Sequence, residues 1–98
     1  MNILCVGDVV GKPGRVVLAE QLPRLIARRQ IDLVVCNAEN AAGGSGLTPQ
    51  LFAAVLRTGV DVVTLGDHVY RKKEIVSSLQ QSDRIVRPAN LSAPAWTR

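Results

Sequence analysis

Three short apolar runs, each closed by polar residues, constrain the fold of this chain more than any other feature. The runs read "NILCV", "IDLVVC" and "VDVVTL", and they are rich in the aliphatic and β-branched residues of buried parallel strands. A segment with helical spacing of apolar residues separates each run from the next. Because parallel strands need a crossover between them, the alternation predicts right-handed βαβ units. We expect an α/β fold with a mostly parallel sheet and flanking helices.

The segments between the runs carry recognisable helix starts. "GKPGR" is typical of a turn, and Pro13 can occupy the first turn of the helix that follows. This helix is expected over 15–29, and Pro23 is expected to kink or split it. Thr48 and Pro49 form a good N-cap pair for a second helix. "RKKEIVSSLQQ" predicts a third helix, and "RIVRPAN" a possible fourth strand. These elements complete the predicted βαβ units.

Length and composition limit the class of protein. With 98 residues the chain allows one small domain, 1–98. Its composition is 47% hydrophobic but only 3% aromatic, which favours α/β packing over an aromatic-rich sandwich. The net charge of +4 is spread over dispersed arginines without interleaved aromatic residues, so we expect no dedicated nucleic-acid surface.

The cysteines and the hydropathy pattern bear on location. Cys5 and Cys36 lie in apolar runs and do not form a CxxC motif, so we predict two buried free thiols in a reducing compartment. No apolar run approaches the ~18 residues of a membrane span, and the sequence begins directly with a strand-like run rather than a leader. We therefore expect a cytoplasmic protein without membrane association.

The polar residues that close the three runs are the candidate functional residues. Ligands of parallel α/β sheets bind outside the carboxyl ends of the strands, so these residues should meet at one edge. Carboxylates at such close range repel unless a cation neutralises them, which a pair of divalent metals would achieve. The alternative is that polar strand ends are simply where the strands meet water. The closing groups are Gly7-Asp8, Asn37-Ala38-Glu39-Asn40 and Gly66-Asp67-His68.

Four linked motifs carry a resemblance to a known family. "GDVVGKPGR", "NAENAAGGSGLT", "GDHVYRKKEI" and "VRPAN" occur in this order, and the resemblance that they carry extends over essentially the whole chain. Together they resemble the N-terminal part of the YmdB-like metallophosphoesterases, bacterial 2′,3′-cyclic-nucleotide phosphodiesterases of the calcineurin-like superfamily. The resemblance implies the N-terminal half of a four-layer α/β/β/α sandwich. It also implies two divalent metal ions, iron or manganese, as cofactors.

The resemblance assigns a role to five residues. It implies that Asp8 is a ligand of the first metal, that Glu39 bridges both metals and that Asn40 is a further ligand of the first. Asp67 stands where the family has an asparagine ligand of the second metal, and a carboxylate remains a good ligand for a hard cation. His68 matches the histidine that donates a proton to the leaving sugar oxygen.

The resemblance also bears on completeness. The later half of the family supplies the second sheet and three further histidine ligands, whereas His68 is the single histidine here. We expect a truncated metallophosphoesterase domain with partial or no metal occupancy and weak or no hydrolysis of 2′,3′-cyclic nucleotides or related phosphodiesters. Its expected partners are a nucleotide or phosphodiester substrate and either a second copy or a complementary C-terminal half. The alternative is a non-catalytic nucleotide-binding or assembly module on the same scaffold.

Overall fold

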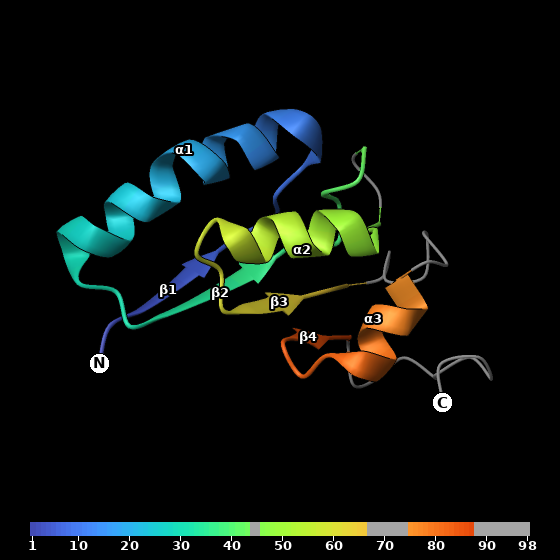
Figure 1. The fold of residues 1–98 in the computed structure, drawn as a ribbon. Helices are drawn as coiled ribbons and strands as arrows, with labels where there is room; N and C mark the ends of the chain where they lie inside the picture. Colours follow the sequence, from blue (N-terminus) through green and yellow to red (C-terminus); the bar gives the residue numbers. More distant parts are fainter. Residues whose placement is uncertain (44–45, 67–74, 88–98) are drawn as a thin grey trace.

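Four parallel strands form the centre of the molecule (Figure 1). The structure is a computed structural model that describes residues 1–43, 46–66 and 75–87. Neighbouring strands pair in the order β1-β2-β3-β4, each parallel to the next. This arrangement confirms the predicted α/β fold with a parallel sheet. The strands are β1 (Ile3–Val6), β2 (Leu33–Asn37), β3 (Val62–Thr64) and β4 (Ile85–Val86).

In the described ranges, three helices connect the strands: α1 (Gly11–Arg29), α2 (Pro49–Arg57) and α3 (Ile75–Gln81). The Thr48 hydroxyl caps α2 by accepting a hydrogen bond from the backbone N–H of Leu51 at 3.2 Å, as the sequence predicts. α1 runs through Pro23 without a break, so the predicted split is wrong. Pro23 is exposed, and water can satisfy the backbone carbonyl that loses its helical partner there.

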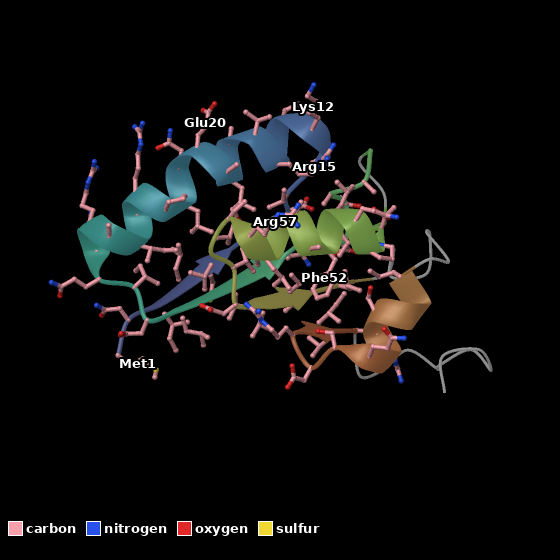
Figure 2. The ribbon with its side chains drawn as sticks, in the orientation of Figure 1. Met1, Lys12, Arg15, Glu20, Phe52 and Arg57 are labelled. Carbon is pink, nitrogen blue, oxygen red and sulfur yellow. The ribbon has the colours of Figure 1, made fainter. Side chains whose placement is uncertain are left out.

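The apolar core lies between the helices and one face of the sheet. Figure 2 shows Phe52 of α2 directed toward the sheet, whereas Lys12 and Glu20 project outward from α1. No helix of the described residues is long and apolar enough to cross a membrane. The largest fully buried side chains are Leu22, Val34, Cys36, Leu47, Val55, Val60, Val63 and Ile75.

No helix among the described residues covers the opposite face of the sheet (Figure 1). Pairing register places Cys5 opposite Val35 and Thr64 opposite Val86, so these positions share a face. Ile3 is 54% exposed and Val86 is 48% exposed on that face. Cys5 is exposed as well, so the prediction of a buried thiol is wrong at this position. We call this surface, formed by Ile3, Cys5, Leu33, Val35, Val62 and Val86, the open face.

A polar residue precedes each strand and binds backbone groups. The Asp32 carboxylate accepts from the backbone N–H of Asn2 at 2.7 Å, and the Asp61 carboxylate accepts from the backbone N–H of Val34 at 2.8 Å. The Arg84 guanidinium donates to the backbone carbonyl of Asp61 at 2.8 Å. These bonds join the amino ends of neighbouring strands.

Candidate metal centre at the carboxyl edge of the sheet

Backbone hydrogen bonds bring the loops after β1 and β2 together. The N–H of Val9 donates to the carbonyl of Asn37 at 3.1 Å. The N–H of Gly11, the first residue of α1, donates to the carbonyl of Asn40 at 3.0 Å. Gly11 has a φ of 58°, a left-handed conformation that glycine adopts without a steric cost. The two strand ends are therefore fixed relative to each other.

Asp8 and Asn40 are in direct contact across these loops. The Asn40 side-chain amide donates to Oδ1 of Asp8 at 2.8 Å. Asp8 also has a φ of 25°, which is an unusual backbone conformation for a residue with a side chain. Such strained positions concentrate at functional sites. The structure thus places side by side the two residues predicted to bind the first metal.

The side chain of Glu39, two residues after β2, extends to the end of the next strand, β3. The backbone N–H of Ala38 donates to the carbonyl of Thr64 at 3.0 Å, which ties the loop after β2 to β3. A β-carbon added to Gly66 would overlap both carboxylate oxygens of Glu39. Close packing of the carboxylate against this backbone therefore requires glycine at position 66. The Glu39 carboxylate thus extends from the loop after β2 to the end of β3, and its role as a group that bridges two metals stays a prediction.

Asn37 lies in the second closing group, but no role for it was predicted from the sequence. Its side-chain amide donates to Oε1 of Glu39 at 3.3 Å. Its Oδ1 atom is buried and has no hydrogen-bond partner among the described residues. The sequence signal was available, because Asn37 opens the polar group that also contains Glu39 and Asn40. Gly66, in the third closing group, was also given no role, because its role depends on a contact that no pattern in the chain reveals.

The oxygen atoms at this edge fit a hard divalent cation. Asp8 and Glu39 supply carboxylates, and Asn40 supplies an amide, which are the ligand types that such ions prefer. Two further features are consistent with a site shaped for a bound group. The Oδ1 atom of Asn37 has no partner among the described residues, and Gly66 has no room for a β-carbon. Among the described residues, no three His, Cys, Asp or Glu side chains gather closely enough to hold a metal alone. The predicted residues Asp67 and His68 lie outside the described residues.

The family model described as "YmdB-like protein" matches residues 4–96. The chain is 41% identical over 90 residues to a 2′,3′-cyclic-nucleotide 2′-phosphodiesterase of Bacillus subtilis, and the match covers 92% of this chain and 34% of that protein. It is 35% identical over 92 residues to a putative phosphatase/phosphodiesterase of Mycoplasma genitalium, covering 93% of this chain and 32% of the relative.

Solved structures share the fold. A hypothetical protein of Thermus thermophilus superposes with a TM-score of 0.84 at 39% identity, covering 94% of this chain and 35% of that one. A phosphatase of Mycoplasma pneumoniae superposes with a TM-score of 0.86 at 34% identity. The match covers 92% of this chain and 32% of the phosphatase. The chain thus spans about a third of the length of these relatives. With a family model matched over nearly its whole length, this chain belongs to the YmdB-like family.

Proposed function

We propose that this chain contributes the Asp8, Glu39 and Asn40 part of a dinuclear metal site that hydrolyses phosphodiesters, with 2′,3′-cyclic nucleotides as the substrate class. The observation that carries the proposal is the meeting of three strand ends at one edge. Asp8 and Asn40 are in contact there, and Glu39 packs against Gly66. The names of the Bacillus and Mycoplasma relatives support a phosphodiester substrate.

We propose a separate role for each residue of the site. Asp8 and Asn40 would hold one cation, and Glu39 would extend to the second, which Asp67 would also bind. His68 is the proposed proton donor to the leaving sugar oxygen. When bound, a pair of iron or manganese ions supplies Lewis-acid polarisation of the phosphoryl group. The free thiols of Cys5 and Cys36 are compatible with the reducing bacterial cytoplasm, where we expect the protein to act.

Metal binding and turnover test this function separately. We expect calorimetric titration with Mn²⁺ to show saturable binding that is weaker than that of the longer Bacillus relative measured alongside. Hydrolysis of 2′,3′-cyclic AMP should be slower than that of the relative, because the chain spans about a third of its length. No detectable Mn²⁺ binding would contradict the proposal. Turnover equal to that of the relative would contradict the idea that the chain provides only part of the site.

The open face favours a second candidate function, that of a non-catalytic nucleotide-binding or assembly module. Ile3 and Val86 expose apolar surface there, and such surface commonly marks an interface. The occupant would be a second copy of the chain or a complementary C-terminal part. Light scattering after size exclusion should then show a defined dimer. A stable monomer without nucleotide affinity would count against this alternative.

A further inference from the structure

We propose that Asn37 is a positioning residue that holds the Glu39 carboxylate in the orientation required for cation binding. The inference deepens the proposed function and rests on it. Asn37 is the last residue of β2 and is half-buried. Its amide nitrogen lies 3.3 Å from Oε1 of Glu39. The same carboxylate packs against Gly66, so the two contacts together restrict its position.

The chemistry of Glu39 fixes the orientation of the Asn37 amide. An ionised carboxylate only accepts hydrogen bonds, so the amide NH₂ group must face it. In the flipped orientation the amide oxygen of Asn37 would face the carboxylate oxygen of Glu39. Both atoms are acceptors, so the hydrogen bond would be lost. Consequently the amide oxygen of Asn37 points away from Glu39. There it is buried without a partner among the described residues.

An unpartnered buried oxygen is costly for folding, and this cost is the observation that points to function. Buried polar atoms in folded proteins are almost always hydrogen-bonded, and each exception calls for an explanation. Two residues earlier in β2, Val35 shows that an aliphatic side chain is accommodated on the same side of the strand. A residue chosen for stability alone at position 37 would be apolar. Asparagine retains the donor to Glu39 at the expense of stability.

The Asn37→Leu substitution separates a positioning role from a structural one because the two roles predict opposite results. It removes the donor to Glu39 and also removes the unpartnered oxygen. We expect Mn²⁺ affinity, measured by calorimetry, to fall about 10–100-fold, the usual effect of losing a residue that orients a metal ligand. We expect the urea midpoint of the metal-free protein to stay the same or rise.

Asn2→Leu is the matched control. The Asn2 side-chain amide donates to the backbone carbonyls of Arg29 at 3.3 Å and Gln30 at 3.0 Å, at the amino end of the sheet. Its loss should lower the urea midpoint and leave Mn²⁺ affinity native. Native Mn²⁺ affinity in Asn37→Leu would overturn the proposal, as would an equal loss of Mn²⁺ affinity in both variants.

A second readout does not depend on metal. The side-chain carboxyl ¹³C resonance of Glu39 in the metal-free protein reports the hydrogen bond from Asn37. We expect it to shift in Asn37→Leu and to stay in place in Asn2→Leu. An unshifted resonance in Asn37→Leu overturns the role of Asn37 itself. A native chain that takes up no Mn²⁺ while this shift occurs counts against the metal-dependent function instead, so the two failures are distinguishable.

Discussion

The two ends of the sheet are both polar, but their polar side chains have different partners. At the amino ends, Asp61 accepts from the backbone N–H of Val34, and Arg84 donates to the backbone carbonyls of Asp61 and Val60. Asn2 likewise binds backbone carbonyls. Each of these side chains satisfies the main chain where a strand begins. The amino ends are therefore polar for reasons of folding.

At the carboxyl ends the polar side chains contact one another instead. Asn40 donates to Asp8, and Asn37 donates to Glu39. One amide oxygen of this group stays unpartnered within the described chain, and the backbone of Asp8 is strained. Both features are more typical of functional sites than of strand ends that only meet water. The comparison favours a binding site over the simpler interpretation that polar residues mark the exits of the strands into solvent.

The largest expected effect comes from Glu39→Gln. Loss of the negative charge at the proposed bridging position should weaken Mn²⁺ binding by more than about 100-fold, since hard cations prefer carboxylate ligands. Calorimetric titration measures this change. Asp61→Asn removes a carboxylate charge at the other end of the sheet and should leave Mn²⁺ affinity native. Equal effects of the two substitutions would erase the proposed distinction between the ends.

Gly66→Ala should have the next largest effect. The added β-carbon would overlap the Glu39 carboxylate and displace it, so we expect Mn²⁺ affinity to fall about 10-fold or more, as for other losses of ligand orientation. Gly7→Ala provides the control, because Gly7 also precedes an aspartate at a strand end, but a β-carbon added there would meet nothing within 4 Å. If both alanine variants bind Mn²⁺ equally well, Gly66 does not shape the site.

Asp61→Ala tests the amino end. The backbone N–H of Val34 would lose its acceptor in a partly buried position, which should lower the free energy of unfolding by about 1–2 kcal/mol. Urea unfolding followed by circular dichroism gives this value. Mn²⁺ affinity should be unaffected. A stability equal to that of the native chain would show that solvent replaces the carboxylate without cost.

The smallest expected effect is that of Arg84→Gln. Arg84 is exposed, so loss of its bonds to the carbonyls of Asp61 and Val60 should lower the free energy of unfolding by only about 0.5–1 kcal/mol. The same urea experiment resolves this difference from Asp61→Ala. A larger loss than that of Asp61→Ala would reverse the proposed order of importance at the amino ends.

The sequence predicted the α/β class because the alternation of apolar runs and helical segments is a local property of the chain. It also predicted that the polar groups closing the first two strands would meet, because parallel strands share their carboxyl edge. It could not predict the exposure of Cys5, which lies on a sheet face that none of the helices in the described part of the chain covers. Nor could it reveal the roles of Asn37 and Gly66, since both depend on the position of the Glu39 carboxylate in space.

The two cysteines make the open face accessible to chemical labelling. Cys36 lies beneath the helices, and burial raises the pKa of its thiol to about 11, so it stays protonated and shielded at neutral pH. Cys5 is exposed on β1 and is available to a reagent such as iodoacetamide. The alkylation rate of Cys5 therefore reports whether anything covers the open face. Alkylation of Cys36 reports the loss of the fold itself.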